Sequence, residues 1–248
     1  MSWGNHGNGI HMNGDASLGG DGLISNAIVS GNVIYNNAKL NAQGVPGGGS
    51  GINMDGVRNS RIENNLLYNN HAGGISLYSI DGGGGSNNNI VVNNTIYQAA
   101  DGRWAVNIRD ASTGNTVLNN ILLHAGARGA ITIWPDSMSG FTSDYNIVTN
   151  RFTRTDGAST ETLAQWRSNT GQDVHSIAGT AAQLFINPTS DLHLLPTAAA
   201  INAGTATQAP TVDLDGRLRP NGGTFDIGAY EWFAAVTSGD FNSDGVVN

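Results

Sequence analysis

Residues 51–70 read GINMDGVRNSRIENNLLYNN, and this stretch decides the fold because variants of it recur along the chain. It opens with a small residue, followed by alternating apolar and polar residues, which is the period-two pattern of a β-strand. The same pattern opens four other segments, which are residues 9–13, 74–78, 105–109 and 130–134. Each repeat therefore begins with a strand.

A second strand in each repeat ends in an asparagine, and the five asparagines are Asn32, Asn65, Asn94, Asn120 and Asn146. Successive members are 33, 29, 26 and 26 residues apart. Short strands that recur at such a period are typical of a solenoid. We predict an all-β parallel solenoid in which the apolar residues point inward. The asparagine amides should stack from coil to coil and bond to one another and to the turn backbone.

Composition narrows the possible partners. The chain has 248 residues, a formal net charge of −8 and no cysteine, and Lys39 is its only lysine. This charge disfavours a nucleic acid or an acidic membrane surface as partner. No apolar run is long enough for membrane insertion. The first residues, MSWGNHGNG, do not resemble a signal peptide, so we expect a fragment that lacks its leader. Upstream coils that carry the active site are a further alternative.

The repeat pattern stops near residue 150. Residues 159–168 predict a short helix that Ser159 or Thr160 caps and Gly171 ends, and this helix should cover the open end of the solenoid. We divide the chain into β-helix coils at 1–150, an irregular C-terminal packing region of the same domain at 151–232, a linker at 233–239 and an incomplete calcium half-loop at 240–248.

The half-loop is predicted from oxygen ligands at loop positions one, three and five, followed by a glycine. These ligands are Asp240, Asn242 and Asp244. The ending GDFNSDGVVN resembles the first half-loop of a type I dockerin repeat, which implies calcium as a cofactor and an extracellular scaffold protein as a partner. The acid expected at position twelve is missing from this sequence.

The coils also resemble a known family. The segments IENNLLYNN, IVVNNTIY and VLNNILL are similar to the repeats of right-handed parallel β-helix proteins of the pectate-lyase-like superfamily. The region from TLAQWRSNTGQD to GAYEW resembles the C-terminal part of secreted bacterial β-helix proteins. The resemblance implies a secreted monomer that acts on a polysaccharide. It does not choose among lyases, hydrolases, epimerases and tailspikes.

The strand register predicts two outward-facing columns on one sheet. The first column contains His11, Asn53, Ser76, Asn107 and Thr132, and the second contains Asn13, Asp55, Tyr78, Arg109 and Trp134. We expect a polysaccharide to lie along this face. The candidate catalytic residues are Asp55, Tyr78, Arg109 and His11, and the candidate substrate-binding residues are Asn53, Asn107, Trp134 and Asp110. Asp55 and Asp81 are candidate calcium ligands in the groove.

Two reactions fit the same residues. In β-elimination from a uronide, Arg109 or calcium neutralises the carboxylate, and Tyr78, His11 or an arginine removes the C5 proton. In hydrolysis, two carboxylates flank the bond, and Asp55 with Asp81 or Asp110 would supply them. We favour the lyase. The hydrolase is one alternative, and a non-catalytic protein that binds polysaccharide or forms a surface scaffold is another.

Each candidate also has a structural interpretation. Asp55 precedes Gly56 and can form a turn, while Asp81 opens a glycine-rich loop. Arg109 and Asp110 can form a local ion pair. His11 can be an ordinary strand residue, and Tyr78 and Trp134 can pack beneath loops. The position of these side chains relative to an open groove should separate the enzyme from the binding protein.

Overall fold

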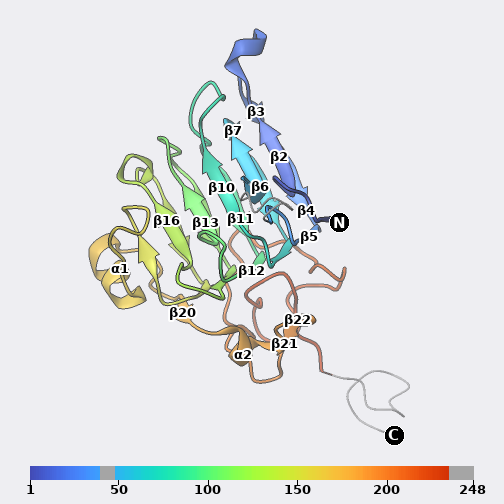
Figure 1. Ribbon diagram of the computed structural model, residues 1–248. Helices are drawn as coiled ribbons and strands as arrows, with labels where there is room; N and C mark the ends of the chain where they lie inside the picture. Colours follow the sequence, from blue (N-terminus) through green and yellow to red (C-terminus); the bar gives the residue numbers. More distant parts are fainter. Residues whose placement is uncertain (40–47, 235–248) are drawn as a thin grey trace, which may run out of the picture.

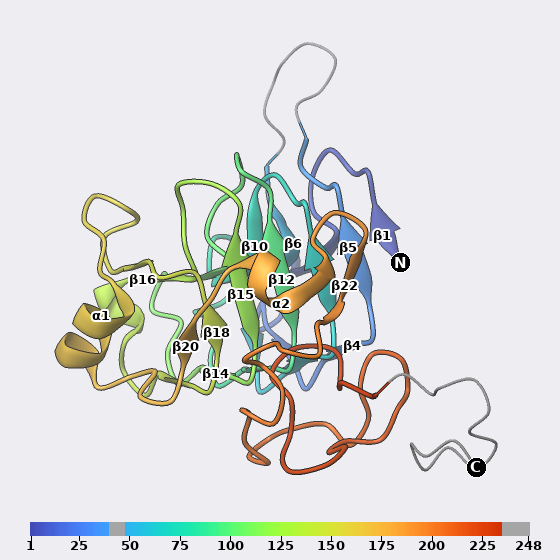
Figure 2. The same cartoon turned by 90° about the horizontal axis from the view of Figure 1, so that it is seen from below.

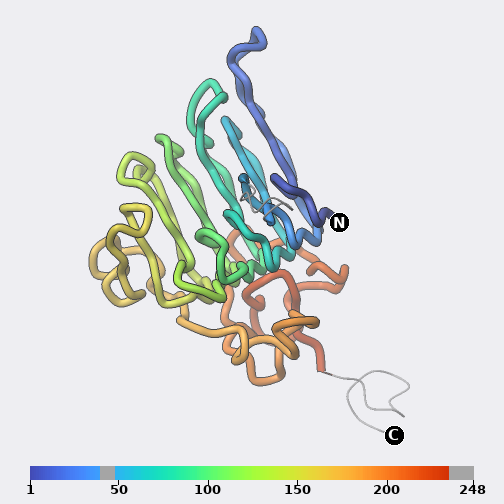
Figure 3. Tube along the Cα trace, viewed as in Figure 1, coloured from blue at the N-terminus to red at the C-terminus, as the bar shows by residue number. Residues whose placement is uncertain are grey.

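The computed structural model of the chain describes residues 1–39 and 48–234. Its body is a β-helix in which successive coils lie side by side as parallel windings (Figures 1 and 3). Three parallel sheets run along the coil axis, and each full coil contributes one strand to each of them. The predicted all-β right-handed parallel β-helix is confirmed. Neither helix of the described ranges has the length and apolar character that crossing a membrane requires.

One sheet contains six strands, and we call it the groove sheet. Its strands in chain order are β2 (Ile10–Asn13), β6 (Ser50–Asp55), β10 (Gly73–Tyr78), β13 (Val106–Ile108), β16 (Ile131–Ile133) and β19 (Phe152–Thr153).

The second sheet has five strands, which are β4 (Ile28–Ser30), β8 (Arg61–Glu63), β11 (Ile90–Val92), β14 (Thr116–Leu118) and β17 (Thr142–Asp144). The third has seven strands, which are β1 (Ser2–Trp3), β5 (Val33–Tyr35), β9 (Leu66–Tyr68), β12 (Thr95–Gln98), β15 (Ile121–His124), β18 (Ile147–Val148) and β20 (Ile177–Ala178). Short strands β3 (Ile24–Ser25) and β7 (Val57–Arg58) also pair in parallel.

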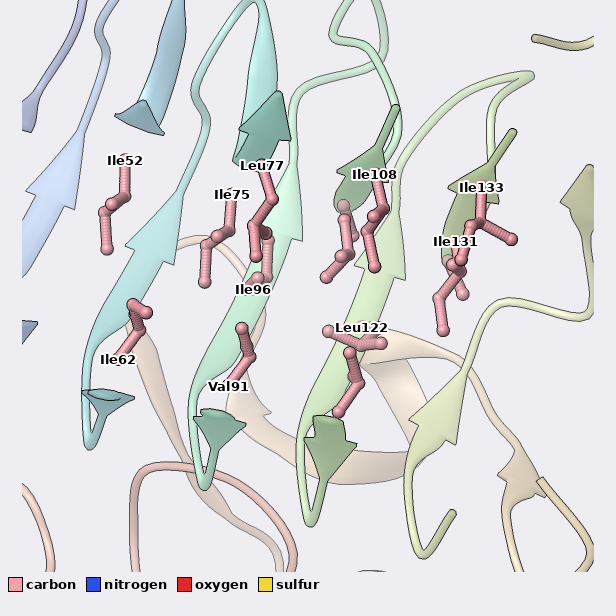
Figure 4. Packing of buried hydrophobic residues seen from close by; sticks show 14 of the residues in the cluster. Ile52, Ile62, Ile75, Leu77, Val91, Ile96, Ile108, Leu122, Ile131 and Ile133 are labelled. Atoms are coloured by element: carbon pink, nitrogen blue, oxygen red, sulfur yellow. The ribbon is translucent and has the colours of Figure 1, made fainter. Parts of the chain in front are cut away.

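Inward-facing side chains stack in rows along the coil axis (Figure 4). Ile52, Ile75, Val106 and Ile131 are register partners on successive strands of the groove sheet, and all are fully buried. Burying one such side chain stabilises the fold by about 1.5–3 kcal/mol before conformational entropy is subtracted. The period-two pattern of the sequence therefore produces one continuous core that runs through the coils.

The turns explain why asparagines occur in pairs. The residue before each asparagine of the predicted stack has a positive φ, for example 50° at Asn64 and at Asn93. Asparagine adopts this left-handed conformation more readily than most residues. The second asparagine of each pair then points into the turn, where its Oδ1 accepts hydrogen bonds from the preceding coil.

The predicted asparagine stack is present. The backbone N and Nδ2 of Asn65 both donate to Oδ1 of Asn94, at 3.1 and 2.9 Å. Asn94 donates in the same way to Asn120, and Asn120 donates to Asn146. Each of these four side chains is completely buried. The stack therefore satisfies polar groups that the turns would otherwise bury without partners.

A helix closes one end of the solenoid, as predicted. Helix α1 (Leu163–Thr170) places Trp166 on Phe152 of the last groove-sheet strand, with stacked ring centroids 4.9 Å apart. Gly171 ends the helix with a φ of 72°. The predicted start and caps are wrong, because Glu161 is held extended by two 2.8 Å backbone hydrogen bonds to Phe152. Thr162 therefore caps the helix.

The C-terminal region packs along the seven-stranded sheet (Figure 2). It contains helix α2 (Ala181–Leu184) and an antiparallel hairpin of β21 (Phe185–Asn187) and β22 (Asp191–Leu194). Beyond the hairpin the segment is irregular. The turn asparagines Asn64, Asn93 and Asn119 donate side-chain hydrogen bonds to its backbone. The parallel ladder itself continues past the expected boundary at residue 150, through β19 to β20.

Buried ionic groups hold the last described segment together. Arg219 and Glu231 form a fully buried ion pair at 2.9 Å, and Arg219 also donates to the carbonyls of Asp226 and Gly228. Asp213 accepts hydrogen bonds from the backbone of Arg217 and Glu231. These residues therefore have a structural role. The predicted loop ligands Asp240, Asn242 and Asp244 lie outside the described residues, as does most of the predicted linker.

Candidate functional site

Two adjoining hollows lie on the outer face of the groove sheet, lined by residues of its strands and of the neighbouring turns, and together we call these hollows the groove. Their volumes are about 280 and 420 Å³. They share four lining residues, which are Ser76, Arg103, Asn107 and Arg109. The first hollow also contacts Asn53 and Tyr78, and the second contacts Arg128 and Asp156. The groove therefore runs across neighbouring coils, parallel to the core rows beneath it.

Both predicted columns exist in register. His11, Asn53, Ser76, Asn107 and Thr132 are successive partners on five strands. In the second column Asn13, Asp55 and Tyr78 are partners, and Arg109 and Trp134 follow the paired residues Ile108 and Ile133. Of the eight residues predicted to act on substrate, four line the groove, and they are Asn53, Tyr78, Asn107 and Arg109.

Tyr78 lies in the groove and has a fixed hydroxyl. Nδ2 of Asn53 donates a 2.5 Å hydrogen bond to this hydroxyl from the neighbouring strand. Partial burial, with a further contribution from the Asp55 carboxylate, raises the pKa of the Tyr78 hydroxyl. The phenol is therefore protonated at neutral pH, and its oxygen is presented to any molecule bound in the groove.

Asp55 organises a turn and is not open to the groove. Its side chain accepts backbone hydrogen bonds from Ile80, Asp81 and Gly82, at 2.9, 2.9 and 3.0 Å. Only 1% of the residue is exposed. Gly82 is required here, because a Cβ atom at this position would lie 2.7 Å from Cα of Gly56. The turn interpretation of Asp55 therefore fits the geometry better than a catalytic one.

A groove calcium does not fit the donor set around Asp55 and Asp81. Both carboxylate oxygens of Asp55 already accept hydrogen bonds from backbone N–H groups. Of the two predicted ligands, only the exposed Asp81 therefore has a carboxylate that is free to bind calcium. Calcium requires six to eight oxygen ligands. In the two described ranges, no group of three or more histidine and acidic residues is arranged to hold a metal ion.

Arg109 combines two local contacts with access to the groove. Its Nε donates to Oδ2 of Asp110 at 3.0 Å, so the predicted local ion pair is present. Its guanidinium carbon lies 5.4 Å from the centroid of the Trp134 ring. Trp134 and Asp110 therefore position Arg109 from outside the groove lining. His11 is exposed on β2 and is not among the lining residues.

Two groove residues were missed by the strand pattern. Arg103 and Arg128 lie on the turns that precede β13 and β16, each three residues before its strand. Because Val106 and Ile131 are register partners, these arginines occupy equivalent positions on neighbouring coils. An arginine at the same offset in two consecutive repeats was the signal available in the sequence. With Arg109, they place three positive charges along one groove.

Comparison with known proteins gives one family. Residues 1–153 match the family described as "Right handed beta helix region". No curated protein matches the chain significantly. The match covers more than half of the sequence and coincides with the coils from β1 to β19. The chain therefore belongs to the right-handed β-helix family.

Proposed function

We propose that the groove binds a segment of an acidic polysaccharide. Three arginines, Arg103, Arg109 and Arg128, line it in a protein whose net charge is −8. This concentration of positive charge on an acidic protein is the observation that carries the proposal, because guanidinium groups bind carboxylates and sulfates with two parallel hydrogen bonds. Asn53, Ser76 and Asn107 add neutral hydrogen-bonding groups that suit sugar hydroxyls.

The same groove supports β-elimination from a uronide as its chemistry. Arg109 would neutralise the uronate carboxylate, which makes the C5 proton more acidic. The ionised oxygen of Tyr78 would take the C5 proton, the C4–O4 bond would break and a C4–C5 double bond would form. Tyr78 would then give this proton to the departing O4 oxygen. The hydrogen bond from Asn53 supports this role, because it fixes the hydroxyl in place.

A binding protein without catalysis is the second candidate. The raised pKa of Tyr78 favours it, because a protonated phenol is a weak base at neutral pH. Hydrolysis has less support. Among the described residues that line the groove, Asp156 is the only one with a carboxylate, whereas glycoside hydrolysis ordinarily needs two carboxylates that flank the bond. We also propose that the protein is secreted, because secretion would bring it to such a polymer.

Polymer retention tests the binding proposal. We expect native gels containing polygalacturonate or alginate to retard the protein, and gels containing a neutral dextran to leave its mobility unchanged. The double variant Arg103→Gln/Arg128→Gln should bind at least about tenfold more weakly, since two charge-assisted contacts are lost. Arg217→Gln is the matched control, because Arg217 is exposed and does not line the groove.

The outcomes separate the candidates. Retention together with absorbance from an unsaturated product would support the lyase. Retention without product, across a panel of acidic polymers, would support the binding protein. Equal retention of the double variant and the control would contradict the groove as the binding site. Retention should also weaken as salt rises, because screening reduces the attraction between guanidinium and carboxylate groups.

A further inference from the structure

A second pocket lies on another face of the molecule, between the solenoid and the C-terminal hairpin. We call it the hairpin pocket, and its volume is about 220 Å³. Val33, Leu66 and Tyr68 come from the seven-stranded sheet, and the other lining residues come from the β21–β22 hairpin and from Tyr230. Crevices between packed units are frequent ligand sites. None of these residues lines the groove.

Its polar wall is held rigidly. Nδ1 of His193 lies 2.6 Å from Oδ1 of Asp191, and Nε2 lies 3.1 Å from Oδ2 of Asp215. The imidazole also lies over the ring of Tyr230, with centroids 4.0 Å apart. A ring with carboxylates at both nitrogens is a double donor, and its charge is balanced by its own partners. The hairpin, the turn at Asp215 and the C-terminal segment around Tyr230 are therefore fixed around one side chain.

The chemistry of the lining selects among ligands. Leu66, Leu192 and the tyrosine rings form apolar surface, while Ser190 and Asp191 offer hydroxyl and carboxylate groups beside it. Within the described part of the chain, neither arginine nor lysine lines the pocket, and both ring nitrogens of His193 face acids. An anionic sugar would be repelled by the carboxylate of Asp191, and no free cation in the described pocket lining would offset this repulsion. A neutral sugar has an apolar C–H face and a rim of hydroxyls, which matches this division.

We propose that the hairpin pocket binds a neutral sugar residue, independently of the groove. Tyr68 and Tyr230 supply aromatic surface for the apolar face of the sugar, and Asp191 accepts hydrogen bonds from its hydroxyls. Burial, with the nearby acids, raises the pKa of Tyr230 to about 12, so its hydroxyl remains a donor. The protein would then hold two kinds of carbohydrate at once, an acidic one on the groove sheet and a neutral one on the seven-stranded sheet.

Calorimetry or ligand-observed NMR on the full chain tests the proposal, with glucose, galactose, mannose, xylose and their short oligomers as probes. We expect millimolar binding of at least one probe. Ser190→Trp, at an exposed lining position, should fill the pocket and weaken that binding at least about tenfold. Tyr230→Phe should weaken it about fivefold through loss of one hydrogen bond. Ser139→Trp, at an exposed turn elsewhere, should have no effect.

Several results would overturn the proposal. These are no binding of any probe, equal binding by Ser190→Trp and the control, or displacement of the neutral sugar by methylammonium at equal concentration, which would make the pocket a cation site. The test is separate from that of the groove. Arg103→Gln/Arg128→Gln should leave neutral-sugar binding unchanged, and Ser190→Trp should leave retention by acidic polymers unchanged.

Discussion

The side-chain amide of Asn53 donates a 2.5 Å hydrogen bond to the hydroxyl of Tyr78 on the adjacent strand. The two residues are not direct register partners, since Asn53 is opposite Ser76 and Tyr78 is opposite Asp55. The bond is therefore diagonal and joins the two outward columns. It fixes the tyrosine oxygen between neighbouring coils, where it borders the groove.

Tyr78→Phe tests whether this oxygen takes part in chemistry. If the groove is a lyase, product formation should fall at least about 100-fold, since a positioned acid or base typically contributes that much. Polymer retention should change little, because the arginines remain. Tyr35→Phe, on the seven-stranded sheet, is the matched control. Equal product formation by the two variants would remove Tyr78 from the reaction.

The pH profile provides a second test. The pKa of Tyr78 is raised above the ordinary value of 10.0, so the ionised fraction at pH 8 is small and grows about tenfold per pH unit. If the tyrosinate is the base, the initial rate should rise with pH through pH 10. Initial rates measured with the intact protein between pH 7 and pH 10.5 check this. A rate that levels off near neutrality would require another base.

Chelation should leave the groove intact. Because the oxygens of Asp55 are bonded to the backbone, removal of calcium with EDTA should not change retention by acidic polymers. Gel retention with EDTA and with added calcium makes the comparison. A loss of retention in EDTA, restored by calcium, would place a metal in the binding site after all.

Asn94→Ala should destabilise the solenoid strongly. Asn94 accepts from Asn65 and donates to Asn120 and to the carbonyl of Ile62, all without exposure to water. Removing the amide leaves several buried groups unpaired, which should cost about 3 kcal/mol of unfolding free energy. Urea unfolding followed by circular dichroism measures it. The control Asn169→Ala, on exposed α1 surface, should cost less than about 0.5 kcal/mol.

Trp166→Ala should expose the capped end of the core. The indole is fully buried on Phe152, and its Nε1 donates to Asp173 at 2.8 Å. We expect a loss of about 4 kcal/mol in unfolding free energy, because a large cavity forms at the last coil. Trp134→Ala, whose side chain is partly exposed, should change stability far less. Similar unfolding midpoints for the two variants would show that α1 contributes little.

The fold could be predicted because its determinants are local and repeat. Ile52 and Met54 alternate with polar residues, and this alone fixes which side chains face the core. The spacing of the asparagines then fixes the register from coil to coil. The start of α1 could not be predicted, because Ser159 and Thr160 are equally good caps. What excludes them is the pairing of Glu161 with Phe152, which arises only in the folded chain.

The site was predicted only in part, for a related reason. The alternation of side chains along a strand places Asn53, Tyr78, Asn107 and Arg109 on the outer face, and these residues line the groove. The same alternation predicts that Asp55 faces outward to the groove, yet backbone N–H groups 25 to 27 residues later in the chain cover its carboxylate. Arg103 and Arg128 lie on turns, where no alternation operates. Their approach to the groove depends on the path of the turn.

From Asn32 to Asn146, the amide-to-amide hydrogen bonds of the asparagine stack all run in one direction, because each amide donates to the asparagine of the following coil. Every internal asparagine of the stack thus has the same two asparagine partners, one that accepts from it and one that donates to it. Gene duplication of a single winding would create no mismatched junction. A protein built in this way can lengthen by whole units, and each added unit extends its groove sheet by about 4.8 Å.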